Sequence, residues 1–252
     1  MRPDWITPQW PAPATVRAVC TTRAGGRSMA PYDSLNLGDH VGDDALAVGA
    51  NRAVLAQALS AHPVFLKQVH GHSVVTLDAH TLHGTEADAC LTRERGLACT
   101  IMVADCLPLL FTDAQGSVVA AAHAGWRGLA GQGGAGVIES LHVALGRPAR
   151  ELMVWLGPCI GPQAFEVGDE VKAAFEAQDA RSAICFTPLA TPGKWLADLQ
   201  ALARQRLNRL GITQIYGNDG TPSWCTVTQT SRFFSHRRDR VSGRLAACIW
   251  RV

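Results

Sequence analysis

Three short runs of this chain that are typical of buried strands carry a histidine or a cysteine near one end. The runs are 66–71 (LKQVHG), 103–110 (VADCLPLL) and 120–131 (AAAHAGWRGLAG), and the residues are His70, Cys106 and His123. Glycine, proline or an acidic residue lies close to each of them, which is typical of a turn rather than of a helix. Two imidazoles and one thiol provide three protein ligands for a metal such as zinc. Three ligands leave one coordination position for water or substrate, as in catalytic zinc sites, and the same donors also bind copper.

The length and charge of the chain exclude several classes of protein. The 252 residues suffice for a sizeable core, and without a repeat, a charge run or a clear linker we expect one domain over residues 1–252. A net charge of +2 is too small for a typical nucleic-acid-binding surface. No apolar run approaches the roughly 20 residues that cross a bilayer, and the N-terminal segment 1–13 lacks the apolar centre of a signal peptide. We therefore expect a cytoplasmic protein without nucleic-acid or membrane partners.

Strand-like and helix-like segments alternate irregularly along the chain. β-branched runs between turn residues predict strands at 16–22, 64–67, 74–77, 97–104, 109–112, 117–122, 153–156, 212–216 and 245–250. Apolar residues at helical spacing and capping residues predict helices at 43–60, 137–145, 169–177 and 195–210. Because several strands follow one another through short turns, the sheets should be mixed rather than purely parallel.

Seven sequence blocks occur together and in order. They are TTRAGGRS at 21–28, SLNLGDHVGDD at 34–44, LKQVHG at 66–71, ADCLPLLFTD at 104–113, AAAHAGWRGLAG at 120–131, GPCIGPQAFEVG at 157–168 and RFFSHRRD at 232–239. Together they resemble the YfiH-type family, whose members are described both as laccase-domain or polyphenol oxidase proteins and as purine nucleoside phosphorylases. The resemblance covers nearly the whole chain. It implies an α/β (α+β) fold, a layered sandwich of mixed β-sheets packed together with helices on the outside.

One segment departs from the family pattern. The family usually runs quickly from GWRGLAG into a helix, whereas Gln132, Gly133, Gly134 and Ala135 intervene here. We therefore expect a longer loop after His123, which would change the shape of a pocket beside it.

The resemblance also implies that His70, Cys106 and His123 form a zinc site, and all three positions are intact. A metal ion would convert the cysteine to its thiolate and polarise water or a substrate atom at the open position. Copper is the alternative metal. Without the resemblance, the same residues also fit two turn histidines and one buried thiol, because ligands this far apart in sequence have no local signature.

Four further residues are candidates for roles in the site. Asp105, next to Cys106, could act as acid and base, orient a ligand imidazole, or only bind backbone amides. Arg127 lies between glycines, where it could bind phosphate or form a structural ion pair. Arg23 and Asn36 lie in the glycine-rich early loops and are candidates for substrate binding, although Asn often stabilises its own turn.

The resemblance implies a zinc-dependent purine nucleoside phosphorylase. Its reaction would convert adenosine, inosine and 5′-methylthioadenosine to the free base and ribose 1-phosphate, with deamination of adenosine as an associated activity. The catalytic residues would be Asp105, Cys106 and Arg127. The partners would then be a small-molecule nucleoside and phosphate, and the chain would be a monomer or a weak homo-oligomer.

Three other functions stay open at this point. A copper-dependent polyphenol oxidase would need several H-x-H pairs, and His70 with His72 forms a single one. A cysteine or metal hydrolase that edits peptidoglycan precursors would use Cys106 as nucleophile and a neighbouring histidine as base. In a non-enzymatic protein, the metal would be structural.

Overall fold

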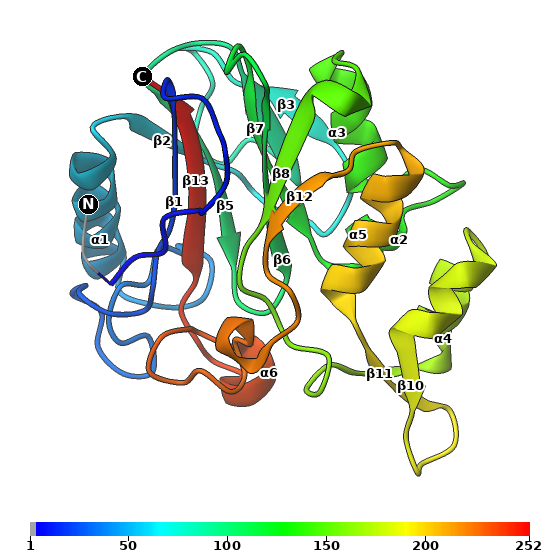
Figure 1. Cartoon of the computed structure of the whole chain (residues 1–252). Coiled ribbons are helices and arrows are strands. Elements are labelled where there is room, and N and C mark those ends of the chain that lie inside the picture. The colour runs from blue at the N-terminus through cyan, green and yellow to red at the C-terminus, as the bar shows by residue number, and fades with distance from the viewer. Residues whose placement is uncertain (1–3) are drawn as a thin grey trace.

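Two mixed β-sheets lie face to face at the centre of the molecule (Figure 1). The computed structural model describes residues 4–252, so residues 1–3 of the N-terminal segment lie outside the described residues. The predicted fold class, mixed sheets packed together with helices on the outside, is confirmed.

The two sheets differ in size, and each contains both parallel and antiparallel neighbours. The four-stranded sheet consists, in spatial order, of β1 (Val16–Cys20), β13 (Leu245–Arg251), β5 (Leu97–Val103) and β2 (His62–Phe65). The six-stranded sheet consists of β12 (Gln214–Gly217), β8 (Leu152–Leu156), β6 (Leu107–Asp113), β7 (Val119–Ala124), β4 (Ala89–Thr92) and β3 (Val74–Thr76). The parallel pairs are β2 with β5, β3 with β4, and β12 with β8.

The inner strands β5, β6, β7 and β8 are buried on both faces, which explains their almost continuous apolar sequence. Successive side chains of a strand point to opposite faces. In β5, Ile101 and Val103 therefore enter the core between the sheets, whereas Ala98 and Met102 belong to the core under helix α1 (Ala45–Leu59).

Helices α2 (Trp126–Ala130), α3 (Val137–Leu145) and α5 (Leu199–Arg209) cover the outer face of the six-stranded sheet (Figure 1). Leu109 and Phe111 of β6 share one buried cluster with Leu141 of α3 and Leu202 of α5. No helix among residues 4–252 is long and apolar enough to span a membrane.

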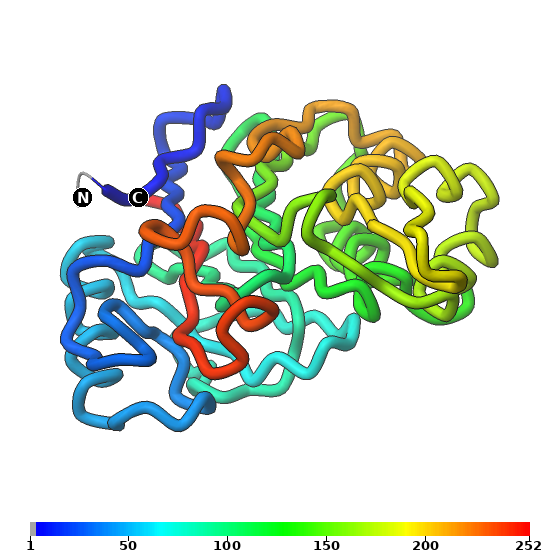
Figure 2. The backbone as a smooth tube through the Cα atoms, turned by 90° about the horizontal axis from the view of Figure 1, so that it is seen from below, coloured from blue at the N-terminus to red at the C-terminus, as the bar shows by residue number. Residues whose placement is uncertain are grey.

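A smaller antiparallel sheet projects from the lower end of the molecule (Figure 1). It contains β9 (Glu166–Gly168), β10 (Phe186–Pro188) and β11 (Lys194–Ala197) and is accompanied by α4 (Asp169–Glu176). The remaining helices are η1 (Ala149–Glu151), η2 (Ala180–Cys185), η3 (Pro222–Trp224) and α6 (His236–Asp239). Seen from below, the segment that contains α6 lies between the N-terminal part of the chain and its middle (Figure 2).

The helix predicted at 195–210 is wrong at its start. Trp195 belongs to β11 and pairs with Val167 of β9, and α5 begins only at Leu199. The side chain of Asp198 accepts a hydrogen bond of 2.7 Å from the amide of Ala201, which is the geometry of an N-cap. The capping residue therefore ends the strand and starts the helix, although the apolar pattern continues through both.

Candidate metal centre and cavity

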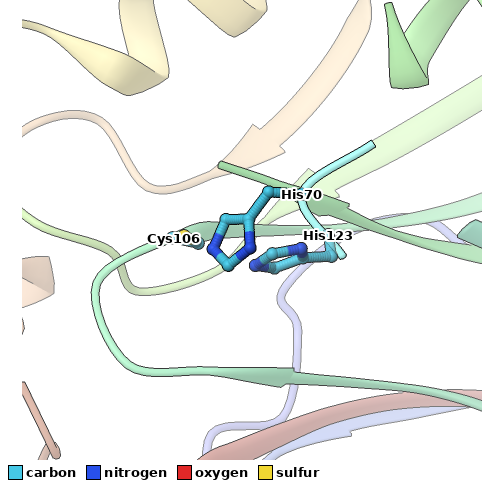
Figure 3. Close-up of side chains that lie close together, drawn as sticks. All are labelled: His70, Cys106 and His123. Carbon is cyan, nitrogen blue, oxygen red and sulfur yellow. The ribbon is translucent and has the colours of Figure 1, made fainter. Parts of the chain in front are cut away.

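The structure brings His70, Cys106 and His123 together, as the sequence predicts. His70 follows β2, Cys106 directly precedes β6, and His123 lies near the end of β7. Their potential ligand atoms all lie within 4.8 Å of one another, and the two imidazole rings are nearly perpendicular, with centroids 4.8 Å apart. Figure 3 shows the two rings and the thiol side by side. Three loop or strand ends from distant parts of the sequence thus form one cluster, which we call the His–Cys–His cluster.

Asp88 organises this cluster from a fully buried position just before β4. Its Oδ1 accepts a hydrogen bond of 2.9 Å from the amide of His70 and lies 2.8 Å from Nδ1 of His123. Its Oδ2 accepts hydrogen bonds from the amides of Val69 and Gly71, at 3.2 and 2.7 Å. One carboxylate therefore fixes the loop that carries His70 and the ring of His123 at the same time.

The contact with Asp88 also selects the tautomer of His123. A carboxylate only accepts hydrogen bonds, so Nδ1 of His123 keeps its proton and Nε2 is the nitrogen from which a metal ion would displace a proton. This is the usual arrangement around metal-binding histidines. Burial opposes the charged form of Asp88, but the hydrogen bonds from His123, Gly71 and Val69 outweigh it and lower the pKa of Asp88.

The donor set fits a metal ion because its cysteine ionises readily. Burial raises the pKa of the Cys106 thiol, but the neighbouring His123 and His70 outweigh this effect and lower the pKa to about 6. Burial lowers the pKa of His123, but Cys106 and Asp88 raise it to about 9. A thiolate is the form of cysteine that binds metals, so Cys106 is prepared for this role at neutral pH.

The backbone around the cluster is strained or tightly packed. His70 and Asp105 have positive φ angles of 61° and 90°, which are uncommon for residues other than glycine and cluster at functional sites. A Cβ atom on Gly125 would lie 2.9 Å from Cδ2 of His70 and 3.1 Å from Sγ of Cys106. The glycine that follows His123 therefore makes room for the other two ligands.

A cavity of about 440 Å³ opens onto the His–Cys–His cluster, and we call it the central cavity. Its volume lies within the range of small-molecule sites. Its apolar walls come from β5, from the starts of α2 and α5, and from the loop between β8 and β9, and include Met102, Val103, Trp126, Ile160, Phe165 and Leu199. The arrangement of apolar walls around polar groups suits a ligand that has both an aromatic part and a polar part.

Arginines dominate the charged lining of the central cavity. Arg127, Arg237, Arg240 and Arg244 line it, and Asp105 is the one carboxylate among the lining residues that the structure describes. The hypothesis that Arg127 faces a potential anion site is therefore compatible with its position on α2. The sequence does not distinguish Arg237, Arg240 and Arg244 from arginines on the surface, because nothing local sets them apart.

Asp105 lies at the cavity wall, but it contacts neither histidine of the cluster. Its Oδ1 accepts a hydrogen bond of 2.6 Å from Oγ1 of Thr226, and its Oδ2 one of 2.6 Å from the amide of Arg237. Of the roles considered for Asp105, orientation of an imidazole therefore belongs to Asp88 instead. Its acid–base role stays a prediction.

Of the three predicted substrate-binding residues, Arg127 lines the central cavity, whereas Arg23 and Asn36 do not. Arg23 pairs with Asp33 at 3.2 Å, beside a separate, open pocket. Asn36 is fully buried, and its Oδ1 accepts hydrogen bonds from the amides of Gly38 and Arg244. Asn36 therefore positions the backbone of a cavity arginine.

The extra residues after GWRGLAG also lie away from the central cavity. Gln132 and Ala135 form a tight bridge between α2 and α3, and the carbonyl of Gly134 accepts a hydrogen bond from Arg206 of α5. None of residues 132–135 belongs to the described lining of the cavity. The loop therefore does not form part of the cavity wall, and its effect on pocket shape stays a prediction.

Comparisons with known proteins agree with this architecture. Residues 17–252 match the family described as multi-copper polyphenol oxidoreductase laccase. A Pseudomonas aeruginosa protein named purine nucleoside phosphorylase is 52% identical over 246 residues, which cover 98% of both chains. Purine nucleoside phosphorylase YfiH of Escherichia coli is 47% identical over 249 residues, again 98% of both chains.

Solved structures show the same fold. A Neisseria meningitidis protein has a TM-score of 0.92 and 45% identity, and the match covers 98% of this chain and 99% of that chain. YlmD from Geobacillus stearothermophilus has a TM-score of 0.85 and 32% identity over 94% of this chain and 92% of that chain.

Proposed function

This chain belongs to the multi-copper polyphenol oxidoreductase laccase family, and from this premise we propose that it is a zinc-dependent purine nucleoside phosphorylase that uses the His–Cys–His cluster and the central cavity. Relatives that are about half identical over nearly their whole length carry the name purine nucleoside phosphorylase. The observation that carries the proposal is the central cavity itself. It joins apolar walls, an ionisable metal-ligand set and unpaired arginines within about 440 Å³.

Phosphorolysis requires the leaving base and the attacking phosphate to lie on opposite sides of one sugar carbon, C1′. The bond between C1′ of the ribose and the base nitrogen breaks, and its electron pair leaves with the base, which takes up a proton. An oxygen of phosphate forms the new bond to C1′, so the products are the free base and ribose 1-phosphate. The protein must therefore hold a flat apolar base, a polar sugar and an anion in a fixed order.

The residues of the central cavity fit these three needs. Phe165 and Ile160 offer apolar contact for the base, and the arginines of the cavity offer positive charge for phosphate. Hydrogen bonds from Thr226 and Arg237 hold the carboxylate of Asp105 in one place. There it would stabilise the positive charge that develops on the ribose as the bond to the base breaks.

His70, Cys106 and His123 would hold the metal ion. When bound, zinc supplies Lewis-acid chemistry, which can polarise a substrate atom or activate water. The second activity in this proposal, deamination of adenosine to inosine, requires an activated water molecule. Asp88 keeps Nε2 of His123 directed to the ligand position, and Gly125 leaves the space between His70 and Cys106 open.

A copper oxidase is disfavoured by the number of ligand groups. Among residues 4–252, one group of three His, Cys, Asp or Glu side chains has ligand atoms close enough for a metal ion. Four-copper chemistry needs several clusters of histidines. The family description therefore states to which proteins the chain is related, but the His–Cys–His cluster does not offer enough ligands for multi-copper chemistry.

A cysteine hydrolase is the second candidate, because the lowered pKa of Cys106 also suits a nucleophile. Alkylation separates the two functions. A nucleophilic Cys106 reacts at once and activity is lost, whereas a metal-bound thiolate is protected until a chelator removes the metal.

The proposal is tested by chromatography of the purine products from adenosine, with and without phosphate. We expect the free bases adenine and hypoxanthine only when phosphate is present, accumulation of inosine when phosphate is absent, and no product from Cys106→Ala. Cys185→Ala is the matched control, because Cys185 is a buried thiol outside the central cavity and should keep full activity. Adenine formation by Cys106→Ala at the rate of the unaltered protein would contradict the proposal.

A further inference from the structure

The segment 236–244 carries three of the four arginines of the central cavity. Arg237 lies in α6, Arg240 directly follows it, and Arg244 directly precedes β13. The fourth, Arg127, lies on α2 and comes from the six-stranded sheet's side of the cavity. Positive charge is thus concentrated on the wall formed by the C-terminal segment that crosses the lower end of the molecule (Figure 2).

None of these four arginines forms an ion pair within residues 4–252, although their neighbour Arg238 does. Arg238 contacts Asp239 at 2.7 Å and also donates to the carbonyls of Thr226 and Val227. It therefore has a structural role outside the cavity lining. The cavity arginines differ from it because their charge is left without a carboxylate partner.

The four cavity arginines are not equivalent. Arg127 stacks over the ring of Trp126 at 4.3 Å, and Arg237 lies over the ring of Phe165 at 5.5 Å and donates to the carbonyl of Glu166. Both guanidinium groups thus lie against aromatic residues of the cavity wall. Arg240 and Arg244 have no aromatic partner among the described contacts.

Arg244 is held in place without being neutralised. Its amide donates to Oδ1 of Asn36 at 2.8 Å, and its Nη1 donates to the carbonyls of Ser242 and Gly243 at 2.9 and 3.1 Å. Burial lowers the pKa of Arg244, although Cys106 and Asp105 oppose this effect, and a guanidinium stays charged at any pH a protein tolerates. Nη1 of Arg244 also lies 3.5 Å from the hydroxyl of Ser242, so all of these partners are neutral, and a partly buried cation with neutral partners is costly unless an anion joins it.

Arg240 combines a strained backbone with a side chain that forms no hydrogen bond among residues 4–252. Its φ angle is 61°, a conformation that a non-glycine residue adopts only when the surroundings impose it, and its amide donates to the carbonyl of His236. Its side chain is exposed at the cavity and has no hydrogen-bond partner among residues 4–252. The strained backbone therefore presents a free guanidinium to the cavity.

We propose that Arg240 and Arg244 form the phosphate subsite of the central cavity and bind inorganic phosphate as the second substrate. The choice of inorganic phosphate rests on the proposed phosphorylase function. Planar guanidinium groups bind phosphate oxygens in pairs, and two of them can hold one anion against the ribose. Arg127 and Arg237 then belong to the aromatic side of the cavity, where the nucleoside binds.

The test compares the KM for phosphate with the KM for inosine in Arg240→Gln, Arg244→Gln and the double variant. Loss of a charge-assisted hydrogen bond should raise the KM for phosphate about 10- to 100-fold in each single variant, while the KM for inosine changes less than about threefold. Arg150→Gln is the matched control, since it removes the same charge from an arginine whose side chain is 83% exposed outside the cavity. Arg127→Gln should mainly raise the KM for inosine. Circular dichroism and thermal melting confirm that each variant is folded.

The outcomes separate this inference from the proposed function. An active double variant with an unchanged KM for phosphate, or a loss that follows Arg127→Gln alone, overturns the subsite and leaves the phosphorylase standing. Calorimetry with inorganic phosphate alone reports binding without turnover. If the unaltered protein shows no phosphorolysis but binds phosphate, and the double variant does not bind it, the anion site is supported and the proposed reaction is refuted. Binding of adenosine 5′-monophosphate through these arginines, without binding of inorganic phosphate, overturns the assignment to the free anion.

Discussion

Replacement of Asp88 by Asn tests how the cluster is organised, because the two side chains have nearly the same shape. Asp88 is fully buried and accepts four contacts, three from backbone amides and one from His123. Both oxygens of Asp88 accept hydrogen bonds, whereas asparagine has one oxygen and one NH₂ group, which can only donate. The NH₂ group would therefore face N–H groups that it cannot bind. Either the amides of Val69 and Gly71 lose their acceptor, or the amide of His70 and the ring Nδ1–H of His123 lose theirs.

The magnitude follows from these contacts. Two donors without an acceptor cost about 1 to 2 kcal/mol each when they are partly buried, so we expect a loss of about 2 to 4 kcal/mol in the free energy of unfolding. We also expect zinc affinity to fall about 10- to 100-fold, the usual effect of removing a hydrogen bond to a ligand histidine. Both effects have one cause, the release of the His70 loop and of the His123 ring.

Asp113→Asn is the control that separates the two effects. Asp113 is also fully buried, accepts a hydrogen bond of 2.6 Å from the amide of Ser117 and contacts Arg147 at 3.3 Å, but it lies outside the central cavity. Chemical denaturation gives the stability, and competition with a zinc-binding dye gives the affinity. Both variants should lose stability, and Asp88→Asn alone should lose affinity. Equal zinc affinity in the two variants would refute the role of Asp88.

Three further predictions test the site and the fold. Gly125→Ala should reduce zinc affinity at least tenfold in the same dye assay, because its methyl group meets His70 and Cys106, whereas Gly49→Ala in α1 has nothing within 4 Å and should bind zinc normally. In the metal-free protein, the rate of alkylation of Cys106 should rise with pH through a midpoint of about 6, as thiolate forms; a midpoint near 9 would show an ordinary thiol. Asp198→Ala should lower the free energy of unfolding by about 1 kcal/mol through loss of the α5 cap, and an unchanged denaturation midpoint would contradict this capping role.

The sequence predicts the elements whose local signals agree with their packing. The helix at 137–145 coincides with α3, because its apolar stripe and the following Gly146 indicate the same boundaries. The start of α5 is wrong because Trp195 continues the helical spacing, while pairing with β9 makes it a strand. Local pattern and tertiary pairing compete there, and pairing prevails.

The candidate site divides in the same way. The sequence predicts the three ligands His70, Cys106 and His123 because they lie in blocks shared with the family, although no spacing rule joins them. Asp88 was missed because nothing in its local sequence marks it, and its four contacts come from residues that only the fold brings near. Arg240 and Arg244 could not be assigned to the cavity from the sequence for a related reason: a cavity arginine and a surface arginine look alike in sequence.

Titration of zinc into the chelated protein, followed by the rate of inosine phosphorolysis, tests most directly that the His–Cys–His cluster is the catalytic centre. We expect the rate to rise linearly and to level off at one equivalent of zinc per chain, with no response in Cys106→Ala. Full phosphorolysis before any zinc is added, or a response that persists in Cys106→Ala, would contradict this assignment.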